Sequence, residues 1–397
     1  MKLALFTDTL ADVNGVSRFI TALGEHTHQR GRALRVFTST DLALSPRPWA
    51  TNIKPMFASR MPGYANLRLA IPSPRALAAA VRDFAPDVVH VSTPGPVGLL
   101  GRRWALRHRL PLVGTYHTDF PAYVTRLFND DGLGEFTGTL ISWFYRPFDR
   151  VLTRSNAYLA PVRALGVPSE RCAAIRFGVD LARFSPRHRD EDLLRRVVKG
   201  IGDGPRVLYC GRVSVEKNIR VLASAWVELE TLWRTREHAP PPMLVVVGDG
   251  PGLHGMRSSL RGCNAAFLGF RSGDQLSAII ASCDLLAFPS TTDTLGQSVL
   301  EAQASGLAAV VSHIGGPAEV VVDGQTGVVV RSTVPQVWAR TLLRVLSDRA
   351  ALDRMKLAAR LHAKGLSIDD SLEHFWTLNT HMSRSRHAAT TTQTDHA

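Results

Sequence analysis

The sequence predicts an α/β protein built from two doubly wound domains, each with a parallel sheet at its centre. Short apolar segments, typical of buried parallel strands, alternate with helical stretches along most of the chain. This alternation occurs twice, and the polar segment 176–194, which contains Pro186, separates the two series. The length of 397 residues and the hydrophobic content of 45% are enough for two cores of ordinary domain size.

The order of elements in each half is that of a doubly wound domain. In the first half, the predicted strands are residues 3–9, 33–39, 85–94, 110–119 and 149–155, with helices from about Ser17 and over residues 74–84. In the second half, the predicted strands are residues 205–210, 242–249, 265–270, 284–290 and 308–313. We therefore place one domain at residues 1–185 and the other at residues 190–366.

One segment of the second half spaces two acids around a turn of small residues. It is TTDTLGQSVLE, residues 291–301, in which the acids are Asp293 and Glu301. It directly follows the apolar run CDLLAFPS, residues 283–290, which predicts a buried parallel strand. Because open parallel sheets bind ligands at the carboxyl ends of their strands, we expect this turn to lie in a binding site.

The turn itself has the features of a site for an anion and a sugar. Gly296 allows the backbone to approach a ligand, and the N–H groups of Leu295, Gly296 and Gln297 are predicted to point outward at a helix N-terminus. Asp293 is then placed to bind sugar hydroxyls, and Glu301 to bind a ribose diol. The alternative interpretation is an acidic helix cap at Asp293 and an exposed helix glutamate at Glu301.

Two cations flank a second turn between a strand and a helix. In VLYCGRVSVEKN, residues 207–218, the apolar strand breaks at Gly211 and is followed by Arg212 and Lys217. A diphosphate leaving group suits such a pair, because a guanidinium binds two oxygens while an ammonium neutralises charge that grows as the bond to the sugar breaks. Arginine and lysine near a helix start are also common on surfaces. The prediction therefore depends on both turns occurring in one domain.

Three segments resemble, in chain order, the C-terminal half of a family 4 glycosyltransferase of the GT-B fold. They are GRVSVEKN, VVVGDGPG and FPSTTDTLGQSVLEAQASGLAAVVSHIGGPAEVV. In the N-terminal half, FTDTLADVNGVSRFI is similar to the family's opening glycine loop, and GTYHTDFPAYV to its active-site histidine segment. The resemblance extends from the first predicted strand to the end of the second predicted domain.

The resemblance implies a retaining transferase whose two Rossmann-like domains face each other across a cleft. It implies that His117 contacts a sugar hydroxyl beside the anomeric carbon, and that the departing phosphate takes the proton of the acceptor. It also implies that Asn14 and Gly15 bring backbone N–H groups to the donor phosphate or to the acceptor. Without the resemblance, Asn14-Gly15 equally fits a tight turn, and His117 a structural histidine.

Four residues are thus the candidate catalytic residues, and the acidic turn and the glycine loop supply substrate contacts. The candidate catalytic residues are His117, Arg212, Lys217 and Asp293. The candidate substrate-binding residues are Asn14, Gly15, Leu295, Gly296, Gln297 and Glu301. We expect no metal and no other cofactor in the site, since arginine and lysine neutralise the diphosphate. The pair Gly315-Gly316 resembles a family loop and is interpreted as structural.

One position departs from the family pattern. The family has two glutamates separated by seven residues, whereas the first acid here is Asp293, which is one methylene shorter. The donor sugar therefore stays open between GDP-mannose and a UDP-hexose. The departure also motivates an alternative function, a catalytically impaired protein that binds nucleotide sugars. An epimerase or phosphorylase of the same fold is less compatible with the ordered pairs of cations and acids.

Charge is concentrated in the first half of the chain. Of the net charge of +13, residues 1–190 hold 25 lysines and arginines against 14 acids. We expect this basic half to contact an anionic membrane surface and the acceptor to be a glycolipid or lipid-linked glycan. Residues 101–110 and 140–151 combine arginines with apolar side chains that suit lipid headgroups, although core packing explains both. We expect no nucleic acid partner, because no recognition module is visible.

The remaining features concern the cell compartment and the chain ends. The four cysteines lie far apart and are interpreted as reduced core residues. The N-terminal apolar run is too short for a signal peptide, and nothing has the length of a membrane span. We expect a cytoplasmic protein, peripheral on the inner face of the cytoplasmic membrane. Residues 367–382 are expected to form a helix that returns to the first domain, and residues 383–397 a disordered tail.

Overall fold

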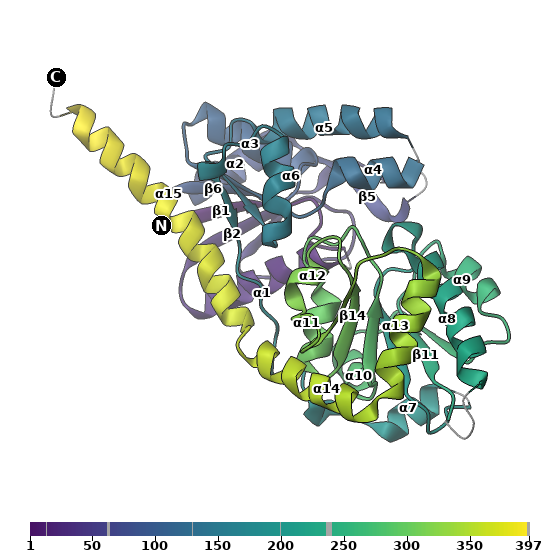
Figure 1. Ribbon diagram of the computed structural model, residues 1–397. Coiled ribbons are helices and arrows are strands. Elements are labelled where there is room, and N and C mark those ends of the chain that lie inside the picture. The colour runs from purple at the N-terminus through teal and green to yellow at the C-terminus, as the bar shows by residue number, and fades with distance from the viewer. Residues whose placement is uncertain (13, 62–63, 129, 199, 236–239, 395–397) are drawn as a thin grey trace. The chain divides into compact units, whose positions relative to one another are not determined.

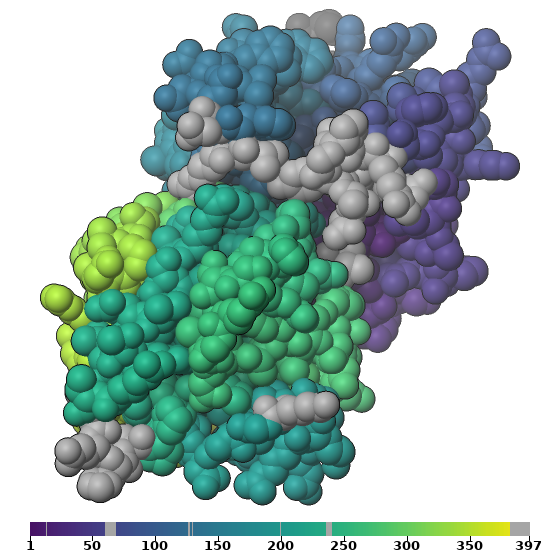
Figure 2. All heavy atoms as spheres, turned by 90° about the vertical axis from the view of Figure 1, so that its right-hand side faces the viewer, coloured from purple at the N-terminus to yellow at the C-terminus, as the bar shows by residue number. Residues whose placement is uncertain are grey.

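The computed structural model describes residues 1–12, 14–61, 64–128, 130–198, 200–235 and 240–394. They form two compact units (Figure 1). The first unit comprises Met1–Pro121, Gly132–Arg176 and the chain from Asp369 onward. The second comprises Ala122–Asp131 and Phe177–Ile368, and the latter residues run from teal to yellow-green in Figure 2.

The first unit is built on a parallel sheet in which, among the described residues, seven strands have the order β3-β2-β1-β6-β7-β8-β9. The strands are β1 (Lys2–Phe6), β2 (Ala33–Thr38), β3 (Ala50–Asn52), β6 (Val88–Val91), β7 (Leu112–Tyr116), β8 (Arg150–Thr153) and β9 (Cys172–Ala174). An antiparallel hairpin is formed by β4 (Pro55–Met61) and β5 (Tyr64–Pro72). The helices are α1 (Gly15–Gln29), α2 (Pro74–Phe84), α3 (Pro96–Arg107), α4 (Phe120–Phe128, shared with the second unit), α5 (Asp131–Tyr145), α6 (Leu159–Ala164) and α15 (Ile368–Thr394).

Alternation along the strands assigns the helices of this unit to the two faces of the sheet. Val89 and Val91 belong to a core that includes Leu77 of α2, Val97 of α3 and Phe144 of α5. The residue between the two valines, His90, points to the opposite face. There its ring lies 4.7 Å from the ring of Phe375 in α15, which itself packs against Phe19 of α1. Helices α1 and α15 therefore cover the second face.

The second unit has a sheet whose six described strands follow the order β12-β11-β10-β13-β14-β15, all parallel. The strands are β10 (Arg206–Cys210), β11 (Met243–Val247), β12 (Ala265–Gly269), β13 (Leu285–Phe288), β14 (Ala308–Ser312) and β15 (Gly327–Val330). The helices are α7 (Glu191–Val197), α8 (Ile219–Arg234), α9 (Leu253–Ser259), α10 (Gly273–Ala281), α11 (Gln297–Ala304), α12 (Pro317–Val320), α13 (Pro335–Ser347) and α14 (Arg349–Lys364). One core lies between the sheet and α8 with α13, and the other between the sheet and α10 with α11.

These two sheets confirm the predicted α/β class with parallel strands, and each predicted strand segment overlaps a strand of the structure. The sequence did not indicate the hairpin β4–β5, nor the short edge strands β3, β9 and β15. The expected disordered tail also differs, because α15 continues through it to Thr394. No proline or glycine occurs between Ser383 and Thr394 to end the helix.

A buried polar network attaches α15 to the sheet of the first unit. Asn379 donates its amide to the carbonyl of Phe375 one turn earlier, so its Oδ1 is left to accept from Nδ1–H of His90 at 2.8 Å. Nε2 of His90 then accepts from the hydroxyl of Thr115 on β7 at 2.9 Å. The neutral imidazole with its proton on Nδ1 satisfies both ring nitrogens in this way. Burial lowers the pKa of His90 to about 4, although the bond to Asn379 acts in the opposite direction.

We expect His90 to make the first unit less stable in acid. Its pKa is lower in the folded state than in the unfolded chain, so the stabilisation is present above the unfolded pKa and is lost as the pH falls. Because the pKa of His90 is lowered to about 4, its contribution to the free energy of unfolding should fall by about 2 kcal/mol between pH 7.5 and pH 5. Urea titrations of the wild type and of His90→Gln at both pH values measure the difference. An equal loss in both proteins would contradict the assignment.

Candidate functional site

The strand order reverses at the centre of the second sheet, between β10 and β13. The chain segments that follow these two strands cross to opposite faces of the sheet. Open α/β sheets bind ligands at the carboxyl ends of two such strands. The loop after β10 carries Arg212 and Lys217, and the loop after β13 carries Asp293 and Gly296. The fold therefore brings the two turns singled out in the sequence to one edge of one sheet.

An ion pair joins the two turns. Nζ of Lys217 lies 2.8 Å from Oδ1 of Asp293, and both side chains are partly exposed, at 19% and 23%. The other carboxylate oxygen of Asp293, Oδ2, is buried and has no hydrogen-bond partner in the described structure. The lysine thus orients the carboxylate, and a free acceptor oxygen remains on it. This arrangement excludes the interpretation of Asp293 as a helix cap, because the cap position of α11 is Gly296.

The backbone of the acidic turn is shaped by glycine. Gly296 has a φ of 80°, a left-handed conformation that favours glycine, and α11 begins directly after it. The N–H groups of Leu295, Gly296 and Gln297 donate no hydrogen bond to another described residue, as expected for the start of a helix. Three donors are therefore left for an anion. Glu301, on the same helix, is 2% exposed, so its interpretation as an exposed helix glutamate is wrong.

The cationic turn differs from the expectation in its local structure. Lys217 closes a single 3-10 turn, Val215–Lys217, and α8 begins only after Asn218, whose φ is 53°. The side-chain amide of Asn218 donates to the carbonyl of Pro289 at 3.1 Å and contacts the hydroxyl of Thr291 at 3.3 Å. Asn218 therefore fixes the cationic turn to the loop after β13. Asn218 was not among the predicted site residues, although asparagine is one of the residues that tolerate the left-handed conformation.

The backbone of Arg212 is fixed by hydrogen bonding to a neighbouring side chain. The hydroxyl of Tyr209 donates to the carbonyl of Arg212 at 2.6 Å, and burial raises the pKa of Tyr209 well above its ordinary value, so this donor stays protonated. The glycine-rich loop after β11 supports the same turn. A Cβ on Gly248 would lie 1.9 Å from the carbonyl oxygen of Gly211, and one on Gly250 would lie 2.4 Å from that of Val213. Only glycines allow this close approach, which explains the GDGPG sequence.

Gly316 supports the acidic turn from behind. Its N–H donates to the carbonyl of Asp293 at 2.9 Å, and an added Cβ would lie 2.2 Å from the carbonyl oxygen of Thr294. The structural interpretation of Gly315-Gly316 agrees with this contact. The sequence did not show which turn the pair supports.

The remaining predicted residues lie on the first unit. Asn14 caps α1 by accepting from the N–H of Ser17 at 2.8 Å, and its amide contacts the hydroxyl of Thr9 at 2.9 Å. Gly15 is the first residue of α1, and a Cβ there would meet nothing within 4 Å. These contacts give Asn14 a structural role. Its predicted contact with substrate stays a prediction.

His117 follows β7 at the carboxyl edge of the first sheet. Its Nε2 lies 3.0 Å from Oγ of Ser92, which follows the neighbouring strand β6. Burial, and then the positive charge of Arg154, lower the pKa of His117 well below its ordinary value. The imidazole is therefore neutral at physiological pH, and it can exchange a hydrogen bond with a hydroxyl without carrying charge.

Asp8 is a further acid at this edge; it is partly buried and was not among the predicted site residues. Its carboxylate accepts from the hydroxyl of Thr93 at 2.7 Å and from the N–H of Val97 at 2.7 Å. Burial raises its pKa, while these bonds act to lower it. Asp8 thus occupies the N-terminus of α3, which is not open to a ligand.

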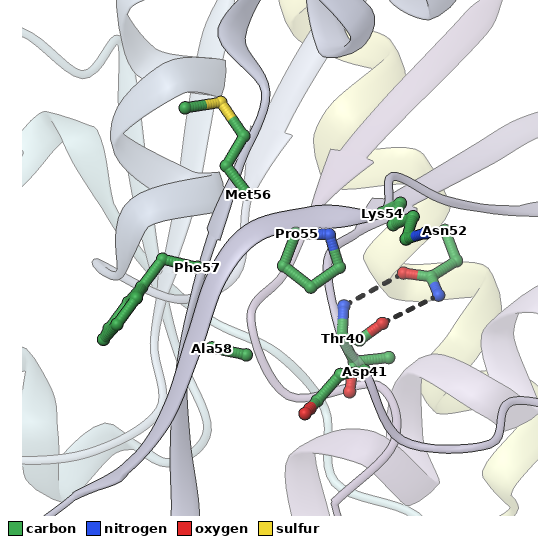
Figure 3. A pocket seen from close by; sticks show the side chains of 8 residues that line it. All are labelled: Thr40, Asp41, Asn52, Lys54, Pro55, Met56, Phe57 and Ala58. Carbon is green, nitrogen blue, oxygen red and sulfur yellow. Dashed lines mark hydrogen bonds between the residues drawn. The ribbon is translucent and has the colours of Figure 1, made fainter.

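A separate hollow of about 360 Å³ lies beside β3 and β4 (Figure 3). Thr40 and Asn52 face each other there through two hydrogen bonds, both of 3.0 Å. None of the predicted site residues lines this hollow. Elsewhere in the described chain, no group of three or more histidine, cysteine, aspartate or glutamate residues is arranged to hold a metal ion. The prediction of a site without a cofactor stays a prediction.

We expect Gly316→Ala to damage the acidic turn without unfolding the unit. The added methyl group collides with the backbone of Thr294, so the turn shifts, stability falls by about 1–3 kcal/mol and affinity for nucleotides weakens at least about tenfold. Gly255→Ala is the matched control, because it lies in α9 with open space around it. Urea denaturation and calorimetric titration with UDP and GDP test both variants. Normal nucleotide affinity in Gly316→Ala would contradict this account of the turn.

The sequence matches known families in both halves. Residues 190–362 match the family described as "Glycosyl transferases group 1", and residues 13–183 match "Glycosyltransferase Family 4". The chain is 31% identical over 326 residues to a GDP-mannose-dependent alpha-mannosyltransferase of Mycobacterium tuberculosis, covering 80% of each chain.

Two further relatives and one solved structure are similar. The chain is 30% identical to the sulfoquinovosyl transferase SQD2 of Arabidopsis thaliana, over 72% of this chain but only 55% of the plant protein. It is 28% identical to the alpha-monoglucosyldiacylglycerol synthase of Streptococcus pneumoniae, over 77% of this chain and 70% of that protein. The crystal structure of Anabaena HepE in complex with UDP and glucose superposes with a TM-score of 0.73 at 17% identity, covering 95% of this chain and 99% of that one.

The structural likeness agrees with the predicted GT-B fold, and the identity to the mycobacterial enzyme over most of both chains shows the family. The chain therefore belongs to the family 4, group 1 glycosyltransferases, and it is an enzyme that transfers glycosyl groups from nucleotide sugars.

Proposed function

We propose that the chain transfers a hexose, with retention of configuration, from GDP-mannose or a UDP-hexose to a hydroxyl of a glycolipid or lipid-linked glycan. The observation that carries the proposal is the Lys217–Asp293 pair, with its free Oδ2, at the reversal of strand order in the second unit. The relatives leave the donor open, since one is named for GDP-mannose and HepE was crystallised with UDP and glucose.

Different residues of the second unit bind different parts of the donor. Lys217 and Arg212 neutralise the diphosphate, on which negative charge grows as the glycosidic bond breaks. The N–H groups at the start of α11 add neutral donors for phosphate or sugar oxygens. Oδ2 of Asp293 accepts from a sugar hydroxyl, and Glu301 from the ribose. Charge neutralisation is thus supplied by the protein's own cations.

The acceptor proton leaves with the diphosphate in this proposal. Attack occurs on the face from which the diphosphate departs, so one phosphate oxygen takes the proton of the attacking hydroxyl. His117 is neutral and is a poor proton donor at physiological pH, which fits a role in binding a sugar hydroxyl. Bond formation at the anomeric carbon and departure of the diphosphate leave one new glycoside and one protonated nucleoside diphosphate.

We expect Lys217→Ala to weaken donor binding and to slow transfer more than binding. The lysine stabilises the transition state most, because the negative charge on the leaving group is largest there, so kcat should fall by about 100-fold or more. Lys356→Ala is the matched control, because Lys356 also pairs with an aspartate of the second unit, Asp284 at 3.2 Å. Calorimetry with a panel of GDP- and UDP-sugars measures binding, and release of nucleotide measures turnover.

The panel also separates the proposed enzyme from its alternative. Tight binding of one donor, lost in Lys217→Ala and kept in Lys356→Ala, supports the donor site and identifies the base. Binding without any release of nucleotide, in the presence of lipid extracts as acceptor, would favour the catalytically impaired protein. Equal affinity of both lysine variants would contradict the role of Lys217.

A lipid acceptor is supported by the exposed surface of α5. Its residues Ile141, Phe144 and Tyr145 are buried in the core of the first unit, but a second apolar stripe is exposed. The stripe is formed by Leu133 (38% exposed), Phe136 (61%), Leu140 (48%) and Trp143 (55%). The spacing of three, four and three residues places these side chains on one side of the helix. Core packing therefore explains only part of this segment.

Arginines adjoin the stripe. The guanidinium of Arg102 stacks on the ring of Trp143 at 4.3 Å and donates to the carbonyl of Phe144, which joins α3 to α5. Arg103 and Arg107 of the same helix α3 are exposed, as is Arg146 after α5. Apolar side chains beside cations suit the interface of an anionic membrane. The structure describes no helix with both the length and the apolarity needed to cross a bilayer.

We expect the variant Leu140→Glu with Trp143→Glu to bind anionic vesicles about tenfold less tightly than the wild type, because it loses apolar insertion and gains repulsion. The matched control is Leu357→Glu, which changes an exposed leucine of α14 in the second unit. Co-sedimentation with phosphatidylcholine vesicles, with and without phosphatidylglycerol, measures the bound fraction. Wild-type binding by the double variant, or binding that salt does not weaken, would contradict this surface.

A further inference from the structure

The first unit contains a buried arginine that has no carboxylate partner among the described residues. Arg154 directly follows β8, and its side chain is 6% exposed. Its Nη1 is buried and has no hydrogen-bond partner, and no carboxylate of the described chain lies within ion-pair distance of it. Its guanidinium carbon lies 4.0 Å from the centre of the ring of Phe19 on α1. Stacking on an aromatic ring is thus the interaction that holds this cation.

The stacking does not compensate for the burial of the charge. A guanidinium gains less from an aromatic ring than it loses when it is buried without a counter-ion. Burial lowers the pKa of Arg154 to about 10, so the side chain keeps its proton at physiological pH. A charge is therefore maintained at a position where an apolar side chain of similar length, such as methionine, avoids this cost.

A second polar group at the same strand end is also unsatisfied. Oγ of Ser155 is buried and has no hydrogen-bond partner in the described structure, and the residue is 1% exposed. Both residues stand at the carboxyl end of β8, beside β7, whose carboxyl end leads to His117. The charge of Arg154 is felt at His117, where it contributes to the lowered pKa. The unsatisfied donors thus belong to the edge of the sheet where ligands bind.

We propose that Arg154 binds a phosphate group of the acceptor. This inference rests on the proposed function, because it assigns the acceptor to the first unit. A phosphate supplies the missing counter-charge and accepts from the forked guanidinium. The acceptor is then a phosphate ester, and the ester is either a phospholipid headgroup or a free phosphorylated polyol.

The test compares the thermal stability of the wild type, Arg154→Met and Arg154→Lys, with and without inorganic phosphate at constant ionic strength. In phosphate-free buffer we expect Arg154→Met to melt at a higher temperature than the wild type. Phosphate should raise the Tm of the wild type more than that of Arg154→Met, and Arg154→Lys should need at least about tenfold more phosphate for the same shift. Arg163→Met, which removes an exposed arginine of the same unit, is the matched control.

Two soluble esters then distinguish the sources of the phosphate. A rise in Tm that depends on Arg154 with dihexanoyl phosphatidylglycerol, below its critical micelle concentration, assigns a lipid headgroup. The same rise with glycerol phosphate alone assigns a free phosphorylated polyol. Equal phosphate shifts in the wild type and Arg154→Met would overturn the proposal, and so would a lower Tm of Arg154→Met without phosphate.

The result is independent of the donor site. Lys217→Ala should keep the part of the phosphate shift that depends on Arg154, because Lys217 lies on the second unit. If donor binding is lost while the phosphate-induced rise in Tm is retained, the proposed acceptor site is still supported. Retained donor binding and transfer, with no shift that depends on Arg154, overturns the acceptor site alone.

Discussion

The geometry of both units depends on the handedness of connections between parallel strands. Such connections are right-handed, so a sheet that grows in both directions from its first strand must send its helices to opposite faces. Both sheets follow this pattern, with reversals between β1 and β6 and between β10 and β13. At these points the loops after neighbouring strands diverge, and their side chains are not covered by a crossing helix. The two turns that the sequence singles out as donor residues occur at the second of these reversals.

The two units hold their cations in different ways. Lys217 is paired with Asp293, so its charge is balanced and both side chains are oriented by the contact. Arg154 of the first unit stacks on an aromatic ring, and no carboxylate among the described residues balances its charge. A paired lysine lowers the stability of its unit little, but a ligand must compete with the aspartate for its charge. An unpaired arginine lowers stability and offers its full charge to a ligand, which is the usual conflict between stability and function at binding sites.

The parts of the fold and the site that the sequence predicted are those that depend on local pattern. Apolar runs predicted the parallel strands, and the order of cationic and acidic turns predicted that Lys217 and Asp293 lie at one edge of one sheet. The contacts of Asn218 and Gly316 were missed, because they join backbones that are far apart in the chain. The unsatisfied state of Arg154 was missed for the same reason, since burial and partners are properties of the packed unit. The exposed stripe of α5 was underestimated, because its two apolar faces look alike in sequence.

The aspartate at position 293 fits this chain's own geometry. The backbone of the turn is fixed from behind by the N–H of Gly316, and Gly296 fixes the start of α11, so the turn has little freedom to retreat. Lys217 is fixed in turn by Asn218, which connects the cationic turn to the loop after β13. Within these limits the carboxylate of Asp293 already reaches Lys217 at 2.8 Å. A side chain one methylene longer would have to fold back to make the same contact. The shorter acid is therefore matched to the position of the lysine, and its departure from the family pattern is no argument for a damaged site.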